Sequence, residues 1–144
     1  MALEDAVMSK HLLATTALRH WLCRCLVACF AFTSVAHHLY GTVKAFQAAA
    51  LSKQAPALCR ASVVAAIGAL TKEHGQRLGG PMALESVMVC AKQLPLRDLS
   101  LRLCAMDALG LVLEGTAGKL PPSITNEAIK AVNGEMPYDA MCVM

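Results

Sequence analysis

The chain has 144 residues and a mass of 15.2 kDa; 56% of its residues are hydrophobic and only 16% are charged. This much apolar side-chain area excludes intrinsic disorder, and the length predicts a single domain. The formal net charge of +3 is spread without a basic block, which excludes the clustered Lys and Arg typical of nucleic-acid binding. We therefore expect no nucleic-acid partner.

The first predicted elements are two helices, over residues 12–32 and 35–51, with a turn near Thr33 and Ser34. Residues 25–36 form the most hydrophobic stretch, and a membrane-embedded subunit is one hypothesis for them. A membrane span needs roughly 20 apolar residues, however, and this run is shorter. A signal peptide is disfavoured because acidic residues open the chain where basic ones would be expected. We expect a buried helix here and no integral membrane span.

Seven cysteines are distributed along the chain: Cys23, Cys25, Cys29, Cys59, Cys90, Cys104 and Cys142. An odd number, mostly inside apolar helical runs, is not typical of a secreted disulfide framework, so we expect free thiols that pack as small apolar groups. The alternative is a metal site, with the ligand set Cys23, Cys25, Cys29 and His37 or His38. On a helix Cys25 and Cys29 share a face that excludes Cys23, and no second cysteine pair follows at zinc-site spacing. We predict no metal and no cofactor.

Further helices are predicted by apolar residues at spacings of three and four over residues 59–78, 84–94, 99–113 and 124–132. In 84–94 the stripe includes Val87, Met88 and Leu94. The segment 99–113 has two apolar faces, one with Leu99, Leu103, Met106, Gly110 and Leu113, the other with Leu101, Leu109 and Val112. A helix that is apolar on two faces is expected to lie between neighbouring helices. No segment alternates as a strand does, so the chain is predicted to be all-α.

Prolines and glycines divide the chain in the same way. Pro56, Pro81, Pro95 and the pair Pro121 and Pro122 stand where helices are expected to begin. Glycines stand where helices are expected to end, at positions 79, 80, 115, 118 and 134. Ser123 is a candidate N-cap for the last helix. The loops are short, so successive helices are expected to be antiparallel neighbours.

A repeat of about 40 residues is the most informative pattern. Pro56 and Pro95 are 39 residues apart and Pro81 and Pro121 are 40 residues apart. Between these prolines a long helix followed by a short one occurs twice, with Arg60 and Gly68 corresponding to Arg102 and Gly110. Such a period is typical of HEAT-type helix pairs. The cost of each glycine in a helix, about 1 kcal/mol, is expected to be offset by close helix–helix approach.

The predicted architecture is thus an all-α, HEAT/armadillo-type α-solenoid of about three antiparallel helix pairs. Residues 1–144 form a single helical segment with pairs at about 8–52, 56–94 and 96–134, and 135–144 begin a truncated helix. Solenoid ends are normally covered by polar capping repeats. Neither end of this chain is polar enough to serve as a cap, so apolar faces are expected to be exposed at one or both ends.

The sequence also resembles a known family. Residues 57–70 (ALCRASVVAAIGAL) followed by 73–79 (EHGQRLG) are similar to the N-terminal region of the HEAT repeat-containing protein 5 family. In that family a helix of the type K-L-A-A-V-x-C-x-G-A leads into E-K-x-G-R-x-L-G. The similarity covers about residues 36–142, including 39–47 upstream, and 73–79 is its most specific part. The first thirty residues depart from the family pattern, and the chain is far shorter than family members.

The resemblance implies a non-enzymatic scaffold in vesicle-mediated transport. Family members are very large cytosolic α-solenoids that accompany the clathrin adaptor complex at the trans-Golgi network and endosomes. They support protein localisation, endocytosis and retrograde endosome-to-Golgi transport, and no catalytic residues come with the family. Two alternatives remain open: a HEAT- or armadillo-type module of another system, such as nuclear transport or a signalling scaffold, and a non-functional truncated fragment. Neighbouring repeats of a longer chain, or self-association, are further expected partners.

No catalytic motif is present. A cysteine beside a histidine is the only nucleophile and base pair the composition offers, and His37 and His38 fit equally a polar helix face near a turn. His74 is expected at a helix end, where a polar or cationic side chain favours the helix dipole. Met82, Met88 and Met106 are expected in the core rather than in a binding groove. The sequence therefore predicts no catalytic residue and identifies no binding residue.

Overall fold

The structure, a computed structural model, describes residues 16–31, 36–118 and 120–133. They form the helices α2 (Thr16–Ala31), α3 (Ala36–Leu51), α4 (Ala57–Leu78), α5 (Gly80–Gln93), α6 (Leu99–Gly115) and α7 (Pro122–Asn133). No strand occurs in this part of the chain, so the all-α prediction is confirmed for it. The predicted start of the first helix, residues 12–15, and the predicted helix in 135–144 lie outside the described residues.

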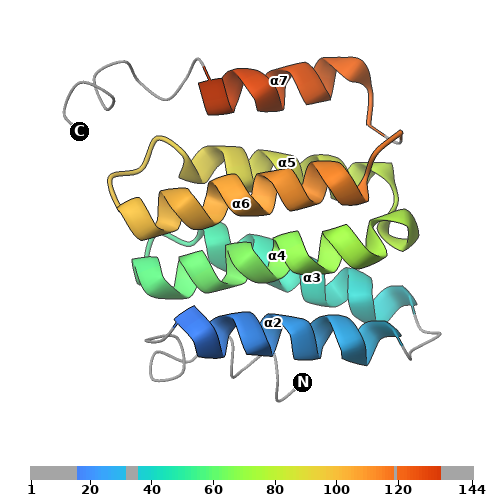
Figure 1. The fold of residues 1–144 in the computed structure, drawn as a ribbon, viewed down its shortest axis with the longest axis horizontal. Coiled ribbons are helices and arrows are strands. Elements are labelled where there is room, and N and C mark those ends of the chain that lie inside the picture. Colours follow the sequence, from blue (N-terminus) through green and yellow to red (C-terminus); the bar gives the residue numbers. More distant parts are fainter. Residues whose placement is uncertain (1–15, 32–35, 119, 134–144) are drawn as a thin grey trace.

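The helices form two layers (Figure 1). In the front layer α2, α4 and α6 lie side by side and run in the same direction, whereas α3 and α5 lie behind them and run the opposite way. The last helix, α7, also runs opposite to α6 and packs on both α5 and α6. Because α4 contacts α2, α3, α5 and α6, it is the central element of the fold.

Most helix ends follow the predicted proline and glycine signals, but the prediction that Pro95 begins a helix is wrong, because α6 begins only at Leu99. Pro56 immediately precedes α4, and Pro81 lies in the first turn of α5. Gly79 separates these two helices with a positive φ of 84°, a backbone conformation that glycine adopts without steric cost. The N-cap of α6 was not predicted: the Asp98 carboxylate accepts a hydrogen bond of 2.8 Å from the Leu101 backbone N–H.

The prediction that Ser123 caps the last helix is wrong. The helix α7 begins at Pro122, so Ser123 already lies inside its first turn. The carbonyl of Pro121 accepts the first hydrogen bonds, from the backbone N–H groups of Ile124 at 3.0 Å and Thr125 at 3.3 Å. Proline at the first helical position loses nothing, because its missing N–H would have no partner inside the helix.

The contact between α4 and α6 is unusually close because glycines lie in it. A Cβ atom added to Gly68 would lie 2.8 Å from the Ala108 Cα atom. One added to Gly75 would lie 2.5 Å from the Gly115 carbonyl oxygen, and one added to Gly115 would overlap the backbone of Thr71. The two backbones therefore approach at distances that only glycine permits. The expected role of glycine in close packing is correct for Gly68 and wrong for Gly110, around which nothing lies within 4 Å.

The two apolar faces of α6 differ in burial. The buried face consists of Leu101, Ala105, Ala108, Leu109 and Val112. On the other face Leu99 is 56% exposed and Leu103 53% exposed, and Met106 and Leu113 are only partly buried. The prediction that α6 is covered on both faces therefore fails for the described residues, because α4, α5 and α7 together leave Leu99 and Leu103 uncovered.

One methionine assignment also needs correction. Met82 is buried and Met106 partly buried, but Met88 is 48% exposed although it follows the core residue Val87. The apolar stripe predicted for α5 was therefore one position too wide at Met88. A short helix that contacts α3, α4, α6 and α7 is covered on some faces only, and periodicity does not reveal where the coverage ends.

Polar side chains join the two layers at the end of α3. Gln93 of α5 donates to the Ala50 carbonyl at 3.2 Å, and Arg60 of α4 donates to the same carbonyl at 3.3 Å and to the Gln93 side chain at 2.9 Å. Ala50 lies in the last turn of α3, where carbonyl groups lack intrahelical partners. Arg102, the repeat counterpart of Arg60, differs: its Nε atom is buried and has no hydrogen-bond partner among the described residues.

We predict opposite effects for the same substitution at the two repeat-related glycines. Gly68→Ala places a methyl group against the backbone of Ala108 and should lower the free energy of unfolding by about 1–3 kcal/mol. Gly110→Ala adds the methyl group to open space in a helix and should raise it by about 0.5–1 kcal/mol. Urea denaturation followed by circular dichroism measures both. Equal effects of the two substitutions would contradict the described α4–α6 contact.

The cysteines should differ in reactivity. Cys90 is fully buried and burial raises the pKa of its thiol from 9.0 to about 12, whereas Cys29 is exposed. A thiol reagent at pH 8 should therefore modify Cys29 in the native protein and Cys90 only after unfolding.

The raised pKa of Cys90 also has a consequence for stability. Between pH 9 and about 12 the thiol ionises in the unfolded chain but not in the folded one, so stability falls as the pH rises, by about 1.4 kcal/mol per pH unit. Comparing urea denaturation of wild type and Cys90→Ala at pH 7.5 and 10 isolates this contribution. An identical pH dependence in the two proteins would contradict it.

Candidate functional site

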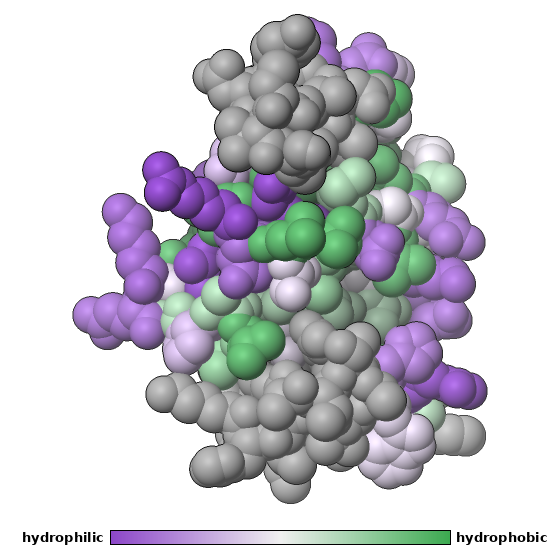
Figure 2. Space-filling model, turned by 60° about the vertical axis from the view of Figure 1, so that its left-hand side comes forward, coloured by the Kyte–Doolittle hydropathy of each residue, from purple (hydrophilic) through white to green (hydrophobic). Residues whose placement is uncertain are grey.

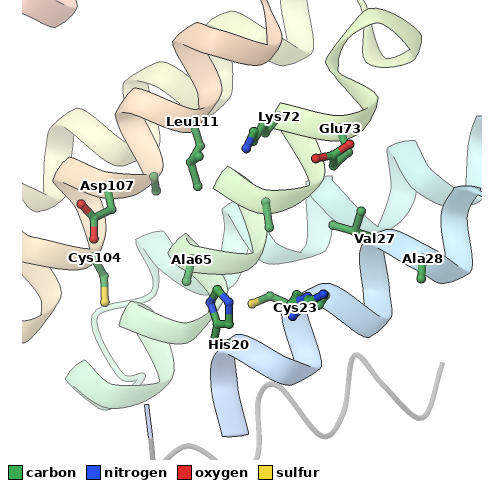
Figure 3. A pocket seen from close by; sticks show the side chains of 13 residues that line it. His20, Cys23, Val27, Ala28, Ala65, Lys72, Glu73, Cys104, Asp107 and Leu111 are labelled. Atoms are coloured by element: carbon green, nitrogen blue, oxygen red, sulfur yellow. The ribbon is translucent and has the colours of Figure 1, made fainter. Parts of the chain in front are cut away.

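A groove runs along the front layer, between α2, α4 and α6 (Figure 3). Its volume is about 640 Å³. Side chains from all three helices line it: His20, Cys23, Arg24, Val27 and Ala28 from α2, Ala65, Ala69, Lys72 and Glu73 from α4, and Cys104, Asp107, Ala108 and Leu111 from α6. It is therefore a feature of the layer and not of a single helix.

The groove exists because the middle helix presents small side chains. Ala65, which Figure 3 labels, and Ala69 lie one turn apart on α4 and line the groove between the two flanking helices; we call these two alanines its floor. Larger side chains on the flanking helices, such as Arg24 on α2 and Leu111 on α6, form the walls. Alanine is also the residue that most favours helix, so the floor costs α4 no stability.

Charges are distributed unevenly around the groove. The α2 wall carries His20 and Arg24, the α6 wall carries Asp107, and Lys72 and Glu73 lie on α4 beyond Ala69. The remaining lining residues are alanine, cysteine, valine and leucine. An apolar floor with a charged rim is the pattern typical of a surface that binds another polypeptide.

The α2 wall is fixed to α4 by polar contacts with backbone carbonyls of α2. Arg77 donates to the Phe30 carbonyl at 2.9 Å, which satisfies one of the last carbonyl groups of α2. The Nε2 atom of His74 lies 3.0 Å from the Val27 carbonyl oxygen, and because a carbonyl only accepts, Nε2 must carry the proton. Nδ1 of His74 then accepts from Arg77 at 3.5 Å. The expectation that His74 lies at a helix end is refined: it is buried one turn before the end of α4 and contacts α2.

The candidate metal ligands are not gathered in one place. Cys23 is buried in the groove wall, Cys25 is half-buried and Cys29 is exposed, all on α2. His38 is exposed on α3, and the side chain of His37 lies outside the described part. Among the described residues no group of three or more His, Cys, Asp and Glu side chains is close enough to hold a metal ion.

The sequence alone did not identify this groove. Its charged residues come from three helices that are about forty residues apart, and each one looks like an ordinary solvated position in its own helix. The two alanines on the floor belong to the run 57–70, which indicated a helix and carried the family resemblance but gave no sign of a groove. Only the side-by-side arrangement of α2, α4 and α6 makes these residues neighbours.

None of the described helices is both long enough and apolar enough to cross a membrane. No model of a protein family, no curated protein and no solved structure matches the chain significantly.

We predict that Arg77 stabilises α2 in particular. Arg77→Met removes the donor to the Phe30 carbonyl and should destabilise the α2–α4 contact by about 1–3 kcal/mol. Hydrogen exchange followed by mass spectrometry should show faster exchange in α2 and unchanged exchange in α6. Lys72→Met, which removes an exposed cation from the same helix, is the matched control. Equal exchange in α2 of the two variants would contradict this role of Arg77.

Proposed function

We propose that this chain is part of a HEAT/armadillo-type α-solenoid and acts as a non-enzymatic scaffold that binds protein partners. The architecture is supported by the alternation of parallel helices in one layer with antiparallel helices behind them, and by the long and short helix pairs α4–α5 and α6–α7. Extended concave surfaces of such stacks are the binding surfaces of repeat proteins. The observation that carries the proposal is the groove with an alanine floor and a charged rim across α2, α4 and α6.

We further propose a role in vesicle-mediated transport, on the basis of the resemblance of residues 57–79 to the HEAT repeat-containing protein 5 family. The partner would be the clathrin adaptor complex, at the cytoplasmic surface of the trans-Golgi network and endosomes. The processes would be protein localisation, endocytosis and retrograde endosome-to-Golgi transport. A scaffold of another system would share the groove but not this partner.

The groove offers a direct test with a matched control. Ala69→Trp fills its floor, whereas Ala48→Trp places the same side chain on the exposed face of α3 in the other layer. We expect purified clathrin adaptor complex to bind the immobilised wild-type chain and the α3 variant equally. The groove variant should bind at least tenfold more weakly, because its ring occupies the space of the partner. Circular dichroism verifies that both variants keep the helical fold.

The outcomes separate the two parts of the proposal. No binding of the adaptor complex to the wild-type chain would overturn the trafficking role. Binding that is equally strong in both variants would mean that the groove is not the binding surface. Asp107→Lys provides a second groove variant with an exposed substitution that leaves the floor unchanged.

A further inference from the structure

The outer face of α6 is an apolar stripe at the molecular surface. It consists of Leu99, Leu103, Met106, Gly110 and Leu113, the first two of which are more than half exposed. Figure 2, which brings forward the side where α4 and α6 begin, shows apolar side chains at the surface among hydrophilic ones. An apolar stripe of this length on a helix normally marks a contact with another element.

The internal repeat relates this stripe to a contact that the structure already contains. Arg60 and Arg102, and likewise Gly68 and Gly110, are separated by 42 residues. The same offset relates residues of α4 to the stripe in this order: Ala57 to Leu99, Ala61 to Leu103, Val64 to Met106, Gly68 to Gly110 and Thr71 to Leu113. On α4 the last four of these positions are buried, and Gly68 and Thr71 lie directly against α6.

The geometry of that existing contact specifies what would fit. α6 lies parallel to α4, since Gly68 meets Ala108 and Gly75 meets Gly115. The face of α4 that contains Gly68 and Thr71 contacts the buried, inner face of α6, which contains Ala108. Two different helix faces are therefore paired. A two-fold dimer pairs identical faces and would not reproduce this arrangement.

We infer that the outer face of α6 is a docking surface for one further helix, which lies parallel to α6 and places glycine, alanine or serine against Gly110. The apolar side chains of that helix pack between Leu103 and Leu113, as the inner face of α6 packs on α4. This inference rests on the repeat architecture of the proposed function but not on its groove or its trafficking partner.

The docking of a further helix is tested with a peptide of residues 98–116. This segment contains α6, which in the structure covers the face of α4 that corresponds to the stripe. Leu99, Leu103 and Leu113 of the peptide are replaced by glutamate or lysine so that only the inner face stays apolar. Binding of the fluorescent peptide to the full chain is measured by anisotropy. We expect saturable binding to the wild-type chain and at least tenfold weaker binding to Gly110→Leu, because a leucine side chain prevents close approach.

Matched variants identify the surface. Gly41→Leu makes the same change at an exposed glycine in α3 with nothing within 4 Å, and should leave binding unchanged. When Ala108→Leu is introduced into the peptide, it should bind the wild-type chain at least tenfold more weakly than the peptide that keeps Ala108. The full chain with the groove substitution Ala69→Trp should bind the peptide that keeps Ala108 as strongly as the wild-type chain does. This last result makes failure at the α6 face distinguishable from failure at the groove.

Two outcomes would overturn the inference. The first is absence of saturable binding, or binding to Gly110→Leu that equals binding to wild type. The second is a dimer of the wild-type chain, seen by analytical ultracentrifugation, that dissociates in Gly110→Leu while no peptide binds. That result would assign the face to a second copy of the chain.

Discussion

The backbone-to-backbone contact of α4 with α6 is the constraint on which the rest of the structure depends. At Gly68, Gly75 and Gly115 a side chain of any size would overlap the neighbouring helix. Glycine in a helix costs about 1 kcal/mol relative to alanine, so three of them weaken the helices that carry them. The dispersion contacts of two closely packed backbones offset this cost. They also hold the two helices parallel and in one register.

Both candidate binding surfaces follow from this contact. Because α6 lies so close to α4, its side chains at Cys104, Asp107 and Leu111 stand directly beside the alanines of α4, which closes one wall of the groove. The same contact fixes the orientation of α6 about its own axis. Leu101, Leu109 and Val112 are therefore buried in the core, and Leu99 and Leu103 stay exposed. The groove and the stripe are thus two sides of one helix, α6, whose rotation is set by α4.

Polar contacts hold α2, α3 and α5 to α4 without disturbing the apolar core. Arg77 and His74 bind carbonyls of α2, and Arg60 with Gln93 binds the last turn of α3. In each case a long polar side chain satisfies a carbonyl in the last turns of a helix, where intrahelical partners are missing or shared. Hydrogen bonds of this kind are directional, so they fix how far each helix slides along its neighbour.

The sequence by itself determined where the helices lie, because the signals for helices are local. Pro56, Pro81 and Pro122 fix helix starts through their restricted φ, Gly79 ends one through its positive φ, and apolar spacing marks each helix between them. The tertiary structure alone decided which of two apolar faces of α6 is buried, why Gly68 is enclosed while Gly110 is open, and which charged residues meet at the groove. These properties depend on contacts between residues about forty positions apart, and a single helix carries no information about the neighbour that will cover it.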